Sequence, residues 1–194
     1  MIIGIGGKSG SGKDTIAEFL QARYGFSYDQ IASPLKSAVK ALFSLSDAEV
    51  YDRELRGKPL AGWPGWTVRK LLQLIGDLLR DNIDGQILVK SLCRRLNNRG
   101  QTPSDWVIPD VRLPNETEML RSVFGKDFVM MRVTRPGFDG RNIGGIEGHK
   151  TEQYDLDADY TFANDSTKED LWKEVEAVME KLLGRTGQTS TTPT

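Results

Sequence analysis

The chain opens with the apolar run Ile2-Ile3-Gly4-Ile5-Gly6, which leads directly into Gly7-Lys8-Ser9-Gly10-Ser11-Gly12-Lys13. The second segment matches the pattern G-x-x-x-x-G-K, and residues 14–24 after it carry apolar side chains at helical spacing. In such a strand, loop and helix, glycines let successive backbone N–H groups point at phosphate oxygens, and the helix N-terminus adds its positive dipole. The stretch therefore predicts a phosphate-binding loop in which Lys13 reaches the terminal phosphates.

The residue after Lys13 departs from the usual pattern, because Asp14 stands where Ser or Thr normally offers a hydroxyl to Mg²⁺. Thr15 follows one place later. Either Asp14 binds or orients hydrated magnesium, or Thr15 supplies the oxygen, and the sequence leaves both open. A dinucleotide-binding fingerprint is excluded, since Ser9 occupies the position of its third glycine.

Composition narrows the class of protein. The 194 residues include 26 Lys and Arg against 27 Asp and Glu, with one His and one Cys, a balance and length typical of a single globular domain. A lone Cys93 excludes an internal disulfide scaffold and a zinc finger. A net charge of −1 argues against nucleic acid as the main partner, and no apolar run approaches the roughly 18 residues of a membrane span. We expect a cytoplasmic monomer or homodimer that binds neither nucleic acid nor membrane.

Strand and helix patterns alternate along the chain. They predict strands 2–6, 106–108, 128–134 and 160–163, helices 14–24, 47–55, 86–96 and 115–124, an amphipathic helix from Thr67, and further helices capped by Ser33 and Ser166. Right-handed βαβ connections then predict an α/β fold of three layers, a mostly parallel sheet with helices on both faces. We expect loops over 57–66 and 97–104, a mobile lid over about 135–150, one domain over 1–183 and a disordered tail over 184–194.

Among proteins with such a loop, a GTPase would need the guanine-reading N-K-x-D and a D-x-x-G, and neither occurs in the sequence. A small-molecule kinase needs a pocket for a second phosphorylated substrate and an arginine-rich lid. Its chemistry requires positive charge that follows the moving phosphoryl group between two anions. The chain offers candidates for each part, which favours a three-layer P-loop kinase fold.

Candidate substrate-binding residues lie on two of the predicted helices. Arg69, Gln73 and Arg80 share the polar face of the helix that begins at Thr67. Arg69 can clamp an acceptor monophosphate while Gln73, one turn later, hydrogen-bonds a base, although a solvated helix face is the alternative. Lys36 lies in the first turn of its helix, where a lysine opposes the helix dipole unless an anion is near.

Asp110 and Arg112 end the central strand, where parallel sheets bind their ligands. Asp110 can hold Mg²⁺ through water or orient the acceptor, and Arg112 can bind a phosphate, with a plain ion pair as the alternative. Arg132 and Arg135 flank the start of the lid, whose closure would bring a cation to the phosphoryl group and expel water. The catalytic candidates are thus Lys13, Asp110 and Arg135, and Arg112 and Arg132 are expected to bind the substrate.

Short motifs follow one another over nearly the whole chain: Gly12-Lys13-Asp14-Thr15, Ser33-Pro34-Leu35-Lys36, Val68-Arg69-Lys70-Leu71-Leu72-Gln73 with Gly76, Pro109-Asp110-Val111-Arg112 with Glu116, Val133-Thr134-Arg135-Pro136-Gly137, His149 with Thr151-Glu152, and Asn164-Asp165-Ser166. Their order and spacing resemble the phage deoxynucleoside monophosphate kinases. The resemblance implies transfer of the γ-phosphoryl group of ATP, with Mg²⁺, to a deoxynucleoside monophosphate. It also implies that Asn164 and Asp165 lie beside the ATP adenine, and that a phage-encoded protein acts in the host cytoplasm.

Alternatives remain at this point. The acceptor can be another phosphorylated small molecule, such as dephospho-coenzyme A or phosphomevalonate, or the chain can be a regulatory module that holds ATP without transferring it. The role of Asp77 is open, because the family tends to place its acidic residue one position later. His149 reads most simply as a loop histidine, and Trp63 and Trp66 either stack on a base or anchor a loop.

Overall fold

The computed structural model describes residues 1–98, 105–137, 145–147, 149 and 156–186. Its centre is a five-stranded sheet in the order β2-β5-β1-β6-β7, and every neighbouring pair is parallel. The strands are β1 (Ile2–Gly6), β2 (Ser27–Tyr28), β5 (Trp106–Val111), β6 (Phe128–Thr134) and β7 (Tyr160–Ala163). The loop that follows β1 therefore begins in the middle of the sheet, at the edge formed by the carboxyl ends of the strands.

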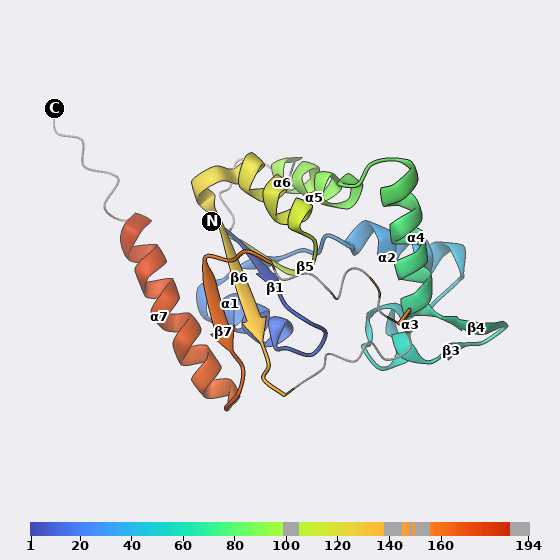
Figure 1. The fold of residues 1–194 in the computed structure, drawn as a ribbon, viewed down its shortest axis with the longest axis horizontal. Coiled ribbons are helices and arrows are strands. Elements are labelled where there is room, and N and C mark those ends of the chain that lie inside the picture. The colour runs from blue at the N-terminus through green and yellow to red at the C-terminus, as the bar shows by residue number, and fades with distance from the viewer. Residues whose placement is uncertain (99–104, 138–144, 148, 150–155, 187–194) are drawn as a thin grey trace.

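Helices cover both faces of this sheet, as Figure 1 shows. Two of them, α1 (Lys13–Tyr24) and α7 (Lys168–Thr186), pack on one face, and α2 (Ser33–Leu42), α4 (Val68–Asn82), α5 (Ile87–Asn98) and α6 (Pro114–Phe124) build the core of the other. Side chains alternate between the two cores, so Ile2 belongs to one and Ile3 to the other. The predicted three-layer α/β fold is confirmed. Within the described ranges, no helix is both long and apolar enough to cross a membrane.

The predicted loop over 57–66 is wrong, because this region forms an antiparallel hairpin of β3 (Pro59–Leu60) and β4 (Trp63–Thr67). Gly62, at a φ of 78°, provides the left-handed turn between the two strands. The hairpin projects from the start of α4, away from the main sheet (Figure 1). The Trp63 ring packs edge-on against Phe43 with centroids 5.0 Å apart, which anchors the hairpin to the end of α2.

Two predicted helix starts are shifted. Ala32, not Ser33, is the N-cap of α2, and the Ser33 hydroxyl instead donates to Asp29. Before α7, the hydroxyl of Thr167 accepts the backbone N–H of Asp170, so the cap lies one residue after the predicted Ser166. Ala32 offers no side-chain cap, so the start of α2 is set without one, whereas Thr167 caps α7 in place of Ser166.

Three predicted ends are also shifted. The capping box of Ser46 and Glu49 is present, but α3 (Asp47–Tyr51) ends before Leu55, and η1 (Leu55–Gly57) follows it. β5 continues to Val111, because Pro109 lies beyond the short pairing with β2 and within an irregularity of the pairing with β1. After η2 (Gly125–Asp127) and the last strand, α7 runs to Thr186, so the first three residues of the predicted tail are helical.

Candidate active site

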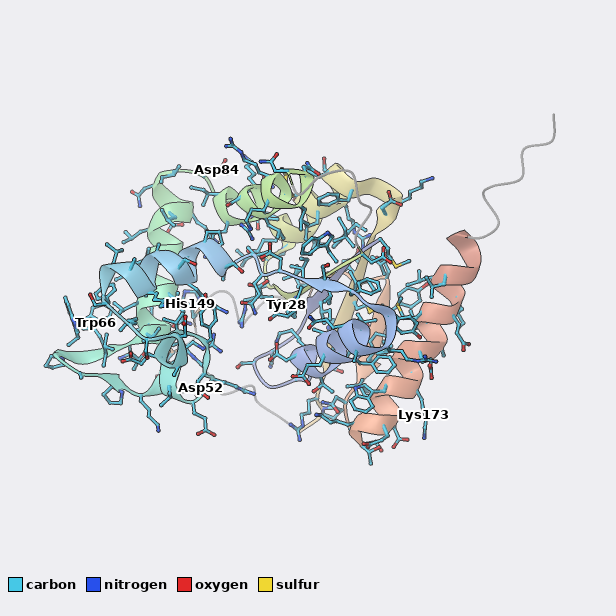
Figure 2. All side chains as sticks on the ribbon, turned by 180° about the vertical axis from the view of Figure 1, so that it is seen from behind. Tyr28, Asp52, Trp66, Asp84, His149 and Lys173 are labelled. Atoms are coloured by element: carbon cyan, nitrogen blue, oxygen red, sulfur yellow. The ribbon has the colours of Figure 1, made fainter. Side chains whose placement is uncertain are left out.

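A cavity of about 730 Å³ opens at the carboxyl ends of β1, β2 and β5, within the range of small-molecule sites. Its walls come from the loop after β1, from α1, α2 and α4, and from the segment after α3. The predicted site residues that line it are Ser9, Gly10, Lys13, Asp14, Lys36, Arg69, Gln73, Arg80, Asp110 and Arg112. Figure 2 shows Tyr28 and His149, which also line it, in the middle of the molecule, and Trp66 at the far edge of the hairpin.

The phosphate-binding loop has the backbone that its glycines predict. Gly7 and Gly12 have φ values of 139° and 116°, and Gly12 caps α1 in the left-handed region. A Cβ on Gly7 would lie 2.3 Å from the carbonyl oxygen of Val133, and one on Gly12 would lie 2.6 Å from Nδ2 of Asn164. No other residue fits either position without moving the strand end or the side chain beside it.

Lys13 is buried inside this loop. Its ammonium donates to the carbonyl oxygens of Gly7 and Lys8 at 2.6 and 2.7 Å. Because both acceptors belong to the loop itself, the charge is held over the concave side where a phosphate would sit. Asp14 lines the cavity next to it, whereas Thr15 is not among the residues described as lining it. Asp14 is therefore the better placed of the two metal candidates.

Asn164, the residue directly after β7, holds the phosphate-binding loop through hydrogen bonds. Its Nδ2 donates to the carbonyl of Ser11 at 2.8 Å, and its backbone N–H donates to Thr134 at 2.8 Å. Asp165 beside it is exposed, and neither residue is described as lining the cavity. Asn164 thus has a structural contact to the phosphate-binding loop, and the adenine contact implied for both residues stays a prediction.

Asp110 holds the chain before α2. Its two carboxylate oxygens accept the backbone N–H groups of Ile31 and Ala32 at 2.8 and 3.0 Å. These contacts, which no local sequence pattern indicates, make Asp110 an anchor for the wall of the cavity. The same wall is tied from outside by Arg95, whose guanidinium pairs with Asp29 at 3.2 Å and donates to the Gln30 carbonyl at 2.7 Å.

Along this wall, burial shifts the pKa values of Asp29 and Lys36, and hydrogen bonds or neighbouring charges oppose these shifts. Burial alone would raise the pKa of Asp29, but hydrogen bonds from Arg95 and from the Gln30 N–H hold it below its usual value. Burial lowers the pKa of Lys36 to about 8, and the nearby Asp110 opposes that shift. The Lys36 ammonium donates to the Gln30 side chain and lies 5.5 Å from the centre of the Tyr51 ring.

The polar face of α4 forms a further part of the cavity wall. Arg69 donates to the carbonyl of Arg53 at 3.2 Å, which ties α4 to the segment after α3. Gln73 accepts the N–H of Ile146 at 2.7 Å, and so joins α4 to the described part of the predicted lid. The remainder of that lid, residues 138–144, 148 and 150, lies outside the described residues, as do Thr151 and Glu152.

Asp77 and His149, whose roles the sequence left open, contact one another. The buried His149 has Nε2 3.0 Å from a carboxylate oxygen of Asp77. Arg80 lies 3.7 Å from Asp77 and 3.5 Å from the buried Glu116, and Glu116 also accepts the N–H of Arg112 at 2.9 Å. Burial raises the pKa of Glu116, against hydrogen bonding and the charge of Arg80. A polar chain thus runs from the lid, through α4, to the end of β5.

Arg132 and Arg135 are differently placed from the other candidates. Arg132 is half-buried on β6 and Arg135 is exposed just after it, and in the described part of the structure neither lines the cavity. Their lid role stays a prediction.

The cations that sequence reasoning missed are Arg53 and Arg56, which do line the cavity. In the sequence, the only signal is that Arg53 directly follows Asp52 and Arg56 comes three residues later, and this spacing is equally typical of two solvent-exposed arginines.

The fold is that of the P-loop kinases. The chain is similar in structure to a gluconokinase from Sinorhizobium meliloti, with a TM-score of 0.53 at 13% identity over 97% of each chain. It is also similar to the APS kinase of Mycobacterium tuberculosis, with a TM-score of 0.50 at 14% identity over 92% of this chain and 96% of that one. At these identities the likeness concerns the fold alone.

Sequence comparison gives the family. The model of the deoxynucleotide monophosphate kinase family matches residues 60–175. The "Putative deoxynucleotide monophosphate kinase" of Acanthamoeba polyphaga mimivirus is 34% identical over 188 residues, which is 90% of this chain and 94% of the viral protein. The chain belongs to the deoxynucleotide monophosphate kinase family, and the resemblance noted from its motifs is confirmed.

Proposed function

We propose that the protein transfers the γ-phosphoryl group of Mg-ATP to a deoxynucleoside monophosphate and releases ADP and the deoxynucleoside diphosphate. The observation that carries this proposal is a single cavity with two cationic walls. Lys13 and the phosphate-binding loop form one wall, and Lys36, Arg69 and Arg112 lie around the other. Two cationic walls of one cavity suit two phosphorylated ligands that meet end to end, which a module that only stores ATP does not need.

In this arrangement Lys13 and the loop N–H groups hold the phosphates of ATP, and Arg69 holds the acceptor monophosphate while Gln73 faces its base. Among the described residues no three His, Cys, Asp or Glu side chains form a metal cluster. Mg²⁺ in kinases is held by one or two carboxylates plus the substrate phosphates, so the lining carboxylate of Asp14 suits it, with Asp110 a second candidate. When bound, the ion neutralises charge on the phosphates.

The acceptor class is tested by a coupled ADP-release assay over the common nucleoside and deoxynucleoside monophosphates, dephospho-coenzyme A and phosphomevalonate. We expect turnover with at least one deoxynucleoside monophosphate. Turnover with one of the other two acceptors alone would contradict the proposed substrate class. ATP binding without turnover on any acceptor would leave the regulatory module as the function.

A pair of variants tests the proposed roles of Arg69, at the acceptor phosphate, and of Arg135, at the transferred phosphoryl group. We expect Arg69→Ala to raise chiefly the KM for the acceptor, because Arg69 holds its phosphate before and during transfer. We expect Arg135→Ala to lower chiefly kcat, because that side chain meets the phosphoryl group only when the lid closes. A charge-assisted contact contributes about 2 to 3 kcal/mol, so each change should reach roughly 30- to 150-fold. An acceptor KM within about twofold of wild type would remove Arg69 from the model, and an unchanged kcat would remove Arg135.

We expect kcat/KM for the acceptor to fall at alkaline pH because Lys36 loses its positive charge there. Its pKa in the folded protein is about 8, below the ordinary 10.5, so the ammonium loses its proton as the pH rises through 8. A neutral Lys36 no longer attracts the acceptor phosphate, and kcat/KM for the acceptor should be about tenfold lower at pH 9 than at pH 7. Lys36→Arg keeps its charge over that range and should flatten the profile. A wild-type profile that is already flat to pH 9.5 would contradict the assignment.

A further inference from the structure

We propose that Arg53 and Arg56 are catalytic residues whose guanidinium groups contact the phosphoryl group during its transfer, an assignment that rests on the proposed function. Both belong to the turn over residues 52–57, called here the arginine turn, which joins α3 to the β3–β4 hairpin. Neither was expected from the sequence, and both line the cavity between the phosphate-binding loop and the acceptor wall.

The conformation of the arginine turn is fixed by its own hydrogen bonds. Oδ1 of Asp52 accepts the N–H groups of Glu54 and Leu55, each at 2.8 Å. The N–H of Arg56 donates to the Asp52 carbonyl at 3.1 Å, and the Arg56 guanidinium donates to the same oxygen at 3.3 Å. An Asp that caps a short turn in this way is a common local motif, and both arginines of this turn line the cavity. Figure 2 marks Asp52 on the side of the molecule away from α5 and α6.

Contacts to two other elements place the arginine turn across the cavity. Arg69 of α4 donates to the carbonyl of Arg53 at 3.2 Å. Nη2 of Arg53 lies 3.4 Å from the hydroxyl oxygen of Ser9, in the phosphate-binding loop. The arginine turn is therefore in contact with both the helix assigned to the acceptor and the loop assigned to ATP.

The electrostatics of Arg56 agree with a position between two anions. Burial and the neighbouring Arg112 and Arg53 lower the pKa of its guanidinium, while Asp14 raises it. The charged neighbours of Arg56 thus include Arg112, on the acceptor side at the end of β5, and Asp14, at the start of α1. A guanidinium stays protonated at any ordinary pH, so this group of like charges is relieved when an anion binds among them.

Phosphoryl transfer requires positive charge between the phosphates of ATP and the acceptor phosphate. An oxygen of the acceptor phosphate forms a bond to the γ-phosphorus as the bond from that phosphorus to the β–γ bridging oxygen breaks, and the electron pair stays on ADP. The total charge is unchanged, but negative charge passes from one side of the cavity to the other through the equatorial oxygens of the phosphoryl group. Two guanidinium groups between the walls can donate hydrogen bonds to those oxygens more strongly in the transition state than in either substrate.

The test compares Arg53→Met and Arg56→Met with Lys58→Met, an exposed lysine that follows the same turn and is not described as lining the cavity. We expect each arginine variant to lower kcat by roughly 30- to 150-fold, with KM values for ATP and acceptor within about threefold of wild type. Lys58→Met should keep kcat. Circular dichroism and the thermal midpoint verify the fold, and Arg56→Lys, which retains a positive charge without the planar fork, should recover only part of the rate.

A bisubstrate analogue separates this assignment from simple substrate binding. In it an oligophosphate chain joins adenosine to the deoxynucleoside of an accepted substrate, and so occupies the place of the transferred group. Both arginine variants should bind it roughly 30- to 150-fold more weakly while binding ATP alone as wild type does. Unchanged kcat and analogue affinity would overturn the proposal, as would a loss confined to acceptor KM. Wild-type protein that turns over no deoxynucleoside monophosphate would instead overturn the proposed function.

Discussion

Lys13→Ala is expected to lower kcat/KM for phosphoryl transfer by about 10² to 10³-fold, the loss typical of removing one preorganised donor from a developing charge. The ammonium lies within the loop, 2.6 Å from the Gly7 carbonyl and 2.7 Å from the Lys8 carbonyl, on the loop expected to hold the phosphates of ATP. The measurement is the initial rate of ADP release with saturating acceptor.

The stability of this variant needs its own measurement, because Lys13 is buried and its two hydrogen bonds hold the loop. Their loss costs about 1 kcal/mol, which lowers the thermal midpoint by roughly 2 to 4 °C in a domain of this size. Lys90→Ala, at an exposed lysine on α5 paired with Asp84, is the matched control and should keep full activity. Near-wild-type transfer by Lys13→Ala would show that the phosphates bind elsewhere.

The phosphate-binding loop and the layered fold could be predicted because their determinants are local. The glycine spacing, the apolar runs and the helical periodicity each act within about ten residues, and the parallel order follows from their alternation. The β3–β4 hairpin was missed for the opposite reason. Its strand of Trp63-Pro64-Gly65-Trp66 has little intrinsic strand preference, and it gains order from contacts such as that between Trp63 and Phe43.

The positions of the site residues were predictable, but their partners were not. The sequence identifies Asp110 at the end of a strand, yet its carboxylate accepts N–H groups that lie 78 and 79 residues earlier in the chain. His149 likewise meets Asp77 across 72 residues. Such pairs depend on how α2, α4 and the lid pack together, and one sequence carries no periodic pattern that reports it. The same reason hid Arg53 and Arg56.

Glu116, which joins the end of β5 and the start of α6 to Arg80 of α4, carries the largest expected change in stability. The side chain is 3% exposed, and one carboxylate oxygen accepts the N–H groups of Arg112 and Leu113 at 2.9 and 3.1 Å. The other oxygen lies 3.5 Å from the guanidinium of Arg80. The carboxylate therefore satisfies the start of α6, fixes the backbone of a substrate-binding candidate and balances a partly buried cation.

Glu116→Leu removes all three interactions and leaves two N–H groups and a guanidinium in a poorly hydrated place. Breaking a buried pair from one side costs about 3 to 5 kcal/mol, so the thermal midpoint should fall by roughly 6 to 20 °C. Glu116→Gln keeps an acceptor oxygen and should lose less. Glu118→Leu, on an exposed position of the same helix, is the control and should melt near wild type.

A double variant identifies the cause of that loss. Arg80→Met added to Glu116→Leu removes a partly buried cation that would keep Asp77, 3.7 Å away, but lose Glu116, so the double variant should be more stable than Glu116→Leu alone if the lost pairing with Glu116 dominates. If the unpaired N–H groups of Arg112 and Leu113 dominate instead, the second change should bring no recovery. A thermal midpoint for Glu116→Leu within about 2 °C of wild type would contradict both explanations, since a buried carboxylate with these partners cannot be removed without leaving them unsatisfied.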